Sequence, residues 1–312
     1  MKRKKRGLTI IEMLVVLGII ATIAGLLIPA TQSVRRYAKN TKQRVQFTNI
    51  SVALEAWKND SELGQYPSSS VRRLPELSGA TNLATAIMGL DMRGFHPATR
   101  LDSDNINDVI GYYNNPQQTI LPDDNIDARR EHYLDMTVAR PFRMWNDAAG
   151  NQPGLFDNVG TLLPYSYALC DVFDFKSRLM PIMDAQGNIL SSKTVKIGSP
   201  ILYFRANING TRLFPQSGSD TYDDRAIYQY ADNMEIVTVK HSDMGQTVFP
   251  EDTYRSDNHN LFYQSIRNPT APNWNENGIV QGQPYRRDTY LLISAGADGI
   301  YGTEDDIQNF GN

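Results

Sequence analysis

MKRKKRGLTIIEMLVVLGIIATIAGLLIPA, residues 1–30, is the stretch of this sequence that decides the fold. Five consecutive basic residues and Gly7 precede an apolar run over residues 8–30, whose only polar side chains are Thr9, Glu12 and Thr22. An α-helix rises about 1.5 Å per residue, so a helix of this length matches the roughly 30 Å hydrocarbon core of a bilayer. The sequence therefore predicts a membrane-spanning helix near the N-terminus.

A secretory signal peptide is the usual interpretation of a basic segment followed by an apolar one. Two features favour a retained anchor instead. The apolar run exceeds the roughly 7–15 residues of an ordinary signal-peptide core. It also contains Glu12, and an ionised carboxylate in a membrane helix costs roughly 2.5–3.5 kcal/mol and marks a functional partner. The alternative is a plain anchor whose carboxylate reaches the headgroup region.

The segment Lys4-Lys5-Arg6-Gly7-Leu8-Thr9-Ile10-Ile11-Glu12 resembles the start of a type IV prepilin or type II secretion pseudopilin, with most similarity to the major pseudopilin. The resemblance implies that a prepilin peptidase cuts after Gly7 and methylates the new N-terminus at Leu8, where the family most often has Phe. It also implies that Glu12 directs assembly. In a filament its carboxylate neutralises the α-amine of Leu8 in a neighbouring copy, so that two charges satisfy each other in an apolar core.

The resemblance also implies partners and a location. The expected partners are copies of the chain in a filament, the prepilin peptidase, an inner-membrane secretion or pilus assembly platform, and other minor pseudopilins. The expected location is the bacterial inner membrane, crossed once, with the N-terminus cytoplasmic and the head periplasmic, followed by a periplasmic or surface filament. A second basic cluster at residues 35–44 competes with the leader under the positive-inside rule, so charge alone does not fix this orientation.

The helix is predicted to continue beyond the membrane, with a kink at Pro29. Apolar and small residues then recur at spacings of three and four, as on the buried face of an amphipathic helix: Val34, Ala38, Thr41, Val45, Phe47, Ile50, Leu54 and Trp57. Gly64 and Pro67 predict that the helix ends near Leu63. The predicted organisation is a cleaved leader at 1–7, a transmembrane helix at 8–30, an amphipathic helix at 31–63 and a globular head at 64–312.

The head is predicted to be α+β. A helix is expected within residues 74–90, capped by Thr81 or Asn82. Residues 91–160 are rich in Asp, Asn, Gly and Pro and are interpreted as a loop-rich insertion that offers a place for a partner to bind. Strand patterns predict an antiparallel sheet packed on the N-terminal helix, as in type IV pilin-like folds; they cover residues 165–170, 194–197, 201–204, 234–239 and 290–294.

Composition limits the classes of function. The chain has 312 residues, of which 41% are hydrophobic and 21% charged, which indicates a folded protein of one or two domains. Ten of the 31 Lys and Arg residues, but only one of the 34 Asp and Glu residues, precede residue 46, which leaves 21 basic and 33 acidic residues after residue 45. This acidic balance argues against a nucleic-acid partner. The single cysteine, Cys170, excludes an intramolecular disulfide.

No catalytic motif is found, and the sequence does not predict an enzyme. The four histidines lack metal-ligand spacing, and no G-x-S-x-G, H-E-x-x-H or phosphate-binding loop motif occurs. Two classes of function remain. One is a structural subunit of a type II secretion pseudopilus or type IV pilus-like filament that supports protein secretion. The other is a minor pilin or tip adhesin whose enlarged head binds a surface or a protein partner.

The region 288–312 contains the last candidate site. Residues 294–307, SAGADGIYGTEDDI, resemble the calcium loop of the major pseudopilin, and the resemblance implies that Ser294, Asp298, Asp305 and Asp306 bind calcium. Calcium takes six to eight oxygen ligands from carboxylates and carbonyls, and the glycines of the segment permit a tight fold. The alternative is an acidic turn without an ion. Because the chain has no disulfide, the ion is expected to close the last loop onto the sheet.

Overall fold

The computed structural model divides the chain into two compact units, residues 1–42 and 43–312, which are described separately. Gly7 and Leu8 lie outside the residues that the structure describes. The described residues are 9–61, 64–70, 77–101, 109, 111–113, 123–145, 154–156, 163, 165–174, 176–183, 189–215, 222–237, 259–276 and 278–311.

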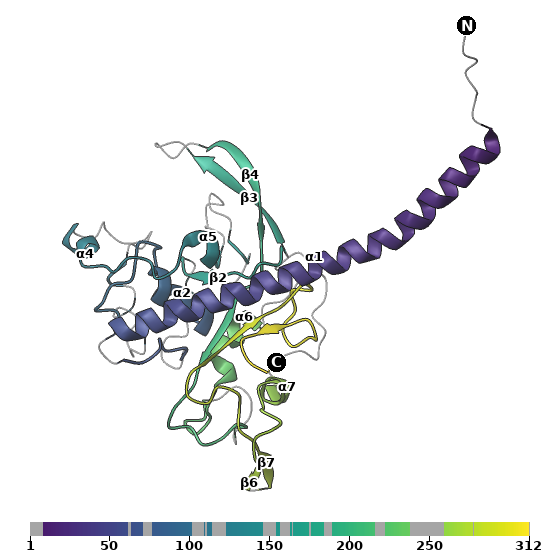
Figure 1. Cartoon of the computed structure of the whole chain (residues 1–312). Helices are drawn as coiled ribbons and strands as arrows, with labels where there is room; N and C mark the ends of the chain where they lie inside the picture. The colour runs from purple at the N-terminus through teal and green to yellow at the C-terminus, as the bar shows by residue number, and fades with distance from the viewer. Residues whose placement is uncertain are drawn as a thin grey trace. The chain divides into compact units, whose positions relative to one another are not determined.

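Helix α1 (Ile10–Asp60) is a single α-helix (Figure 1). The structure assigns helix through Pro29, so this proline does not end it. Within the first unit the large apolar side chains from Ile10 to Ile28 are exposed, and none of the most apolar eighteen-residue window is buried. The helix ends at Asp60, a few residues before the predicted end at Leu63, which lies outside the described residues.

The part of α1 in the second unit packs on the head through one face. Phe47, Ile50 and Leu54 are buried, as predicted, and pack against α2 and the sheet. The predicted face is wrong at Val45, which is 54% exposed. The buried face instead passes through two glutamines that precede Phe47, and the apolar spacing used for the prediction does not include them.

Gln43 and Gln46 replace apolar residues on this face because they satisfy backbone groups of the head. The Gln46 side-chain amide donates hydrogen bonds to the carbonyl oxygens of Val138 (2.8 Å) and Cys170 (2.9 Å). The Gln43 side-chain oxygen accepts from the Val172 N–H at 2.9 Å. Buried backbone groups need such partners, so α1 is joined to the head by polar as well as apolar contacts.

The central sheet of the second unit has three antiparallel strands in the order β5 (Leu202–Arg205), β8 (Tyr290–Ser294) and β9 (Ile307–Gln308). Successive side chains of a strand point to opposite faces. Tyr203 and Leu292 therefore join the cluster that contains α1 and α2, whereas Leu202 and Leu291 join the cluster on the other face. All five residues of β8 are buried, which explains the run of apolar side chains that precedes Ser294 in this strand.

Helix α2 (Gly79–Met88) is buried along its whole length. Its N-cap is Ser78, whose hydroxyl accepts from the Thr81 N–H while the Thr81 hydroxyl accepts from the Ser78 N–H. The predicted cap at Thr81 or Asn82 is therefore wrong, because Thr81 is the third helical residue of this capping box. A Cβ atom at Gly79 would lie 2.2 Å from the Tyr203 carbonyl oxygen, so a glycine is needed where α2 approaches β5.

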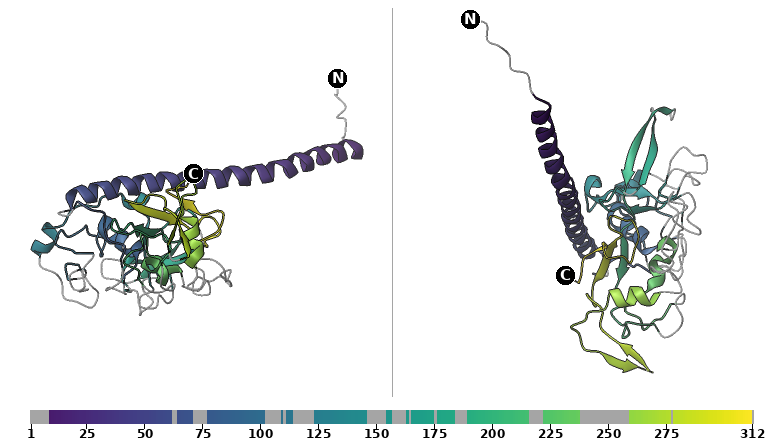
Figure 2. Two further views of the ribbon diagram at one scale, coloured as in Figure 1. Left: turned by 90° about the horizontal axis from the view of Figure 1, so that it is seen from below. Right: turned by 90° about the vertical axis from the view of Figure 1, so that its right-hand side faces the viewer.

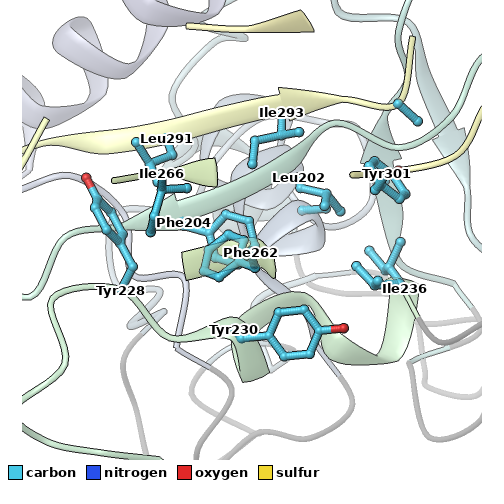
Figure 3. Close-up of a cluster of buried hydrophobic side chains, with 14 of the residues drawn as sticks. Leu202, Phe204, Tyr228, Tyr230, Ile236, Phe262, Ile266, Leu291, Ile293 and Tyr301 are labelled. Carbon is cyan, nitrogen blue, oxygen red and sulfur yellow. The ribbon is translucent and has the colours of Figure 1, made fainter. Parts of the chain in front are cut away.

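The other face of the sheet is covered by η1 (Tyr230–Asn233), α6 (Met234–Val237) and α7 (His259–Ser265). Figure 3 shows the aromatic cluster there, in which Phe204, Phe262 and Tyr230 lie close together. The strand predicted at 234–239 is wrong over Met234–Val237, which is helical. A short apolar run cannot by itself distinguish a strand from a buried helix. Residues 238 and 239 lie outside the described part.

Two-stranded antiparallel sheets and short helices complete the second unit, and the α+β class is confirmed. The β3–β4 and β6–β7 hairpins extend away from it at opposite ends (Figures 1 and 2). The predicted strand patterns at 165–170, 194–197, 201–204 and 290–294 coincide with or overlap strands. The remaining elements are α4 (Asp123–Asp127), α5 (Met136–Ala139), β1 (Pro141–Arg143), β2 (Tyr167–Leu169), β3 (Lys176–Met183), β4 (Ile189–Ile197), β6 (Trp274–Glu276) and β7 (Ile279–Gln281).

The described parts of the insertion at 91–160 contain a packed core as well as loops. Phe95 packs edge to face on Trp57 of α1, and Leu101, Val109 and Tyr113 belong to the same buried cluster. A buried ion pair, with nitrogen and oxygen 2.6 Å apart, joins Asp91 at the start of the insertion to Arg129 near its middle. The insertion is therefore an integral part of the head.

Candidate functional site

The loop between β8 and β9 brings three of the predicted calcium-binding side chains into one short segment. Asp305 is held by three donors: its Oδ2 accepts from the N–H groups of Ala297 (2.6 Å) and Asp298 (3.1 Å), and its Oδ1 accepts from the Thr303 hydroxyl (2.7 Å). The Asp298 Oδ1 accepts from the Ile300 N–H at 2.8 Å. The carboxylates of Asp298 and Asp305 therefore share the turn.

Asp306 contributes a carboxyl oxygen that lacks a partner. Its Oδ2 accepts from the Gly302 N–H at 2.8 Å, whereas its Oδ1 is buried with no hydrogen-bond partner among the described residues. Burial raises the pKa of Asp306 to about 8, and the charges of Asp298 and Asp305 add to the shift. A bound cation would relieve both the missing partner and the repulsion.

The other two carboxyl groups shift in opposite directions. Burial and the charge of Asp305 raise the pKa of Asp298. Burial alone would also raise the pKa of Asp305, but the hydrogen bonds from Thr303 and from the N–H groups of Asp298 and Ala297 lower it. Of the three aspartates, Asp305 is therefore the one whose hydrogen bonds outweigh burial and favour the ionised form.

Ser294 is placed differently from the three aspartates. It is fully buried at the end of β8, where its hydroxyl donates to the Asp171 Oδ2 at 2.8 Å and accepts from the Gly296 N–H at 3.3 Å. Burial raises the pKa of Asp171 to about 7, against the lowering effect of its hydrogen bonds, of which the one from Ser294 is the largest. The hydroxyl of Ser294 is thus engaged in joining β8 to the segment around Asp171.

Helix α7 adds polar side chains beside this loop. An open pocket of about 350 Å³ is lined by Gln264 and Ser265 of α7 together with Gly302, Thr303 and Asp306. The contribution of α7 could not be predicted from sequence, because nothing in the spacing of residues 264 and 306 indicates that they are neighbours. In the described part of the chain, no three His, Cys, Asp or Glu side chains are grouped closely enough to hold a metal ion. Calcium binding therefore stays a prediction.

At the other end of the chain, Glu12 forms a capping box with Thr9. The Glu12 Oε2 accepts from the Thr9 N–H (2.8 Å) and hydroxyl (2.9 Å), and the Thr9 hydroxyl accepts from the Glu12 N–H (3.3 Å). The threonine and the glutamate three residues later satisfy backbone N–H groups that the first turn of a helix leaves unpaired. The sequence contains this T-x-x-E spacing, and our interpretation of Glu12 missed it.

The capping box uses only one of the two carboxylate oxygens of Glu12. Both cap bonds use Oε2, and Oε1 makes no hydrogen bond to any residue that the structure describes. The side chain is exposed at the start of a helix whose apolar residues are also exposed. Gly7 and Leu8 directly precede Thr9, but the structure does not describe them. Glu12 is therefore a carboxylate held by the capping box through one oxygen and flanked by exposed apolar side chains.

The model of the prokaryotic N-terminal methylation motif matches residues 2–28, which include Gly7, Leu8 and Glu12. The N-terminal segment is that of a type IV prepilin-like protein. No curated protein and no solved structure matches it. The match is confined to the N-terminal segment, and the family that it defines is structural rather than enzymatic. The head of this prepilin-like protein must therefore be interpreted from its own structure.

The anchor of the prepilin-like protein agrees with this assignment. Among the described residues, α1 is the helix that is long and apolar enough to cross a membrane, with a mean hydropathy of 2.6 over its most apolar window. One such helix together with the methylation motif fits a pilin-like protein anchored by a single membrane pass. The motif also indicates processing by a prepilin peptidase and assembly into a pilin-type filament.

Proposed function

We propose that this prepilin-like protein is a structural subunit that polymerises through α1 into a type II secretion pseudopilus or type IV pilus-like filament that supports protein secretion. The observation that carries the proposal is the N-terminal part of α1. It is an exposed apolar helix long enough to cross a membrane, it begins with the capping box of Thr9 and Glu12, and this start lies within the methylation motif. Exposed apolar surface of this extent needs a cover. Lipid supplies it before assembly, and helices of other copies supply it in the filament.

Glu12 is the residue that sets the register in this proposal. Its Oε1 is available to the α-amine that cleavage creates at Leu8 of a neighbouring copy. An unpaired charge in an apolar environment is costly, and removing one member of a buried pair costs about 3–5 kcal/mol. The further partners proposed are a prepilin peptidase, an inner-membrane assembly platform and other minor pseudopilins, with the head periplasmic.

Processing is the first prediction that tests the proposal. In cells with an active prepilin peptidase, the mature chain is expected to lack residues 1–7 and to begin with N-methylated Leu8. Intact-mass measurement of the membrane-extracted protein checks this. A chain that retains Met1 in such cells would indicate a plain anchor, and a cut beyond Ala30 would indicate a signal peptide.

The second prediction separates the charge of Glu12 from its capping role. Glu12→Gln keeps a side-chain oxygen that can accept the cap bonds from Thr9 but removes the negative charge, so we expect normal membrane insertion and a large loss of filaments. Thr9→Ala is the matched control: it weakens only the cap, by about 0.5–2 kcal/mol, and should leave most filaments. Filament yield by sedimentation and electron microscopy is the measurement. Normal yield from Glu12→Gln refutes the register role.

We also propose that calcium binds the loop between β8 and β9. The support is local: Asp306 has a buried oxygen without a partner, and burial and mutual repulsion raise the pKa values of Asp298 and Asp306. Oxygen atoms of Asp298, Asp305 and Asp306 are the proposed ligands. Ser294 completes the predicted set; its hydroxyl is already bonded to Asp171. Binding only to the folded head would stabilise it.

The alternative function is a minor pilin or tip adhesin. The specific observation that favours it is the insertion, which builds its own buried cluster beside Trp57 and so enlarges the head as a stable structure. Abundance separates the two functions. A main structural subunit should greatly exceed other prepilin-like proteins in quantitative proteomics of the membrane fraction, whereas a tip protein should be scarce.

A further inference from the structure

The β3–β4 hairpin, residues 176–197 and here called the arm, differs in charge from the rest of the head. The arm contains four basic residues, Lys176, Arg178, Lys193 and Lys196, and one acidic residue, Asp184. The remainder of the head, residues 46–175 and 198–312, is here called the acidic body and contains 17 basic and 32 acidic residues. A cationic arm thus extends from a strongly anionic body.

The arm is anchored at its base. Ile197 is buried in the cluster beneath the sheet and Val195 packs against it. The Arg178 Nε donates to the Gly154 carbonyl oxygen at 3.1 Å. Towards its tip the arm extends away from the acidic body (Figures 1 and 2). It is therefore a positioned element and not a loose loop.

Among the side chains that the structure describes, the arm has exposed residues on both of its faces. Its two strands pair only with each other. Residues directly opposite in an antiparallel pair lie on the same face, so the registers Leu179 with Thr194 and Ser177 with Lys196 place Leu179 and Lys196 on one face, and Met180 with Lys193 lie on the other. Leu179 is 65% exposed, and both lysines are exposed. Neither lysine forms an ion pair among the described residues.

We propose that the arm docks onto the acidic body of a second copy of this chain. Three features favour this occupant. The charges of arm and body are complementary, and every copy carries both. The exposed Leu179 and Leu190 provide apolar contacts. The outer edges of a two-stranded hairpin leave backbone groups that can pair with another chain. The anionic body would repel nucleic acid and anionic lipid. The inference rests on the proposed function, because a filament brings copies side by side.

The test uses the full-length chain in membranes of cells that contain a prepilin peptidase and an assembly apparatus. A photo-crosslinking amino acid is placed at Leu179 or Leu190, and at Val280 as the control. Val280 is 52% exposed and lies on the β6–β7 hairpin at the opposite end of the unit. We expect adducts of twice the subunit mass from the two arm positions at several times the yield from Val280, with crosslinked peptides from the acidic body.

Charge dependence is tested in the same system. Lys193→Glu combined with Lys196→Glu should lower the arm adducts at least fivefold, and Lys193→Arg combined with Lys196→Arg should preserve them. High salt should lower the yield of arm adducts in the chain without charge reversal, because exposed charges are screened. This measurement needs none of the lysine substitutions. Adducts to other proteins or to lipid alone, or copy-to-copy adducts indifferent to charge reversal and salt, would overturn the proposal.

Filament yield from the same samples keeps the two proposals distinguishable. If filaments form but the arm positions do not crosslink copies, arm docking is refuted and the proposed function stands. If salt-sensitive adducts between copies form without filaments, arm docking stands and the proposed function falls.

Discussion

Calcium should raise the melting temperature of the head by an amount that the loop between β8 and β9 can account for. The perturbation is the addition of millimolar calcium to a soluble fragment that begins near Arg35 and contains the whole second unit. An ion present at a hundred times its dissociation constant stabilises the folded state by about 2.7 kcal/mol. At about 2–4 °C per kcal/mol for domains of roughly 150–250 residues, the shift should be about 5–10 °C.

The structure also predicts the sign of the effect of removing a ligand. In chelator, the Asp306 Oδ1 is buried without a partner, and such an atom destabilises a fold by about 1–3 kcal/mol. Asp306→Ala should therefore leave the calcium-free head as stable as the wild type or more stable. In calcium the order should reverse, because the variant gains little from the ion. Asp298→Ala together with Asp306→Ala should abolish the calcium-dependent shift.

Differential scanning fluorimetry and calorimetry of each protein, in chelator and in calcium, measure these shifts. Asp288→Ala is the matched control, because Asp288 is an exposed carboxylate outside the loop; its calcium shift should equal that of the wild type. Magnesium should have little effect, since it demands near-octahedral geometry and keeps its waters. A wild-type head whose melting is the same in chelator and in calcium would remove the site, and so would an undiminished shift in the double variant.

Two further predictions concern the stability of the head. Burial raises the pKa of Asp232 to about 6, against the hydrogen bonds from Ser69 and Tyr222. The native state therefore holds this proton more tightly than the unfolded chain, whose carboxyl has a pKa near 3.8; the group's contribution is greatest below pH 4 and falls, by on the order of 3 kcal/mol, as the pH rises through 6. Burial also raises the pKa values of Asp171 and Asp306, which add slopes of the same sign. Urea titrations at pH 4–7 should therefore show a steeper fall of stability with pH in the wild type than in Asp232→Asn, and equal slopes would refute the contribution of Asp232. Leu54→Ala should cost about 2–5 kcal/mol, because Leu54 is fully buried on the face of α1 that packs on the head. Val52→Ala, at an exposed position of the same helix, should change stability by less than about 0.5 kcal/mol. Equal losses from the two would refute the observed packing of α1.

The parts of the fold that sequence predicted best are those with one dominant physical cause. The apolar run of α1 and the uninterrupted apolar residues of β8 need no knowledge of distant neighbours. The predicted buried face of α1 failed at Val45, because Gln43 and Gln46 occupy that face to bond carbonyl and N–H groups of segments more than ninety residues away. Local spacing cannot reveal partners supplied by the tertiary fold.

The candidate sites likewise include features that depend on local sequence and features that depend on packing between distant segments. The T-x-x-E spacing of Thr9 and Glu12 is local and could have been interpreted as a cap as well as an assembly feature. The polar pocket beside Asp306 could not have been predicted, because Gln264 and Ser265 come from α7, whose approach to the loop depends on the aromatic cluster around Phe262. The missed functional side chains are therefore those positioned by packing at long sequence separation.

The head closes its C-terminal loop without a disulfide, and the structure shows which bonds contribute. The Ser294 hydroxyl bonds the buried carboxylate of Asp171, and the buried Tyr301 hydroxyl donates to the Pro200 carbonyl oxygen. These two bonds join the loop region to Asp171 and Pro200, which lie just before and just after the arm in the chain. These bonds hold the loop in place without an ion, so calcium would bind a turn that is already formed. Calcium should therefore stabilise the folded head, and the head should still fold without calcium.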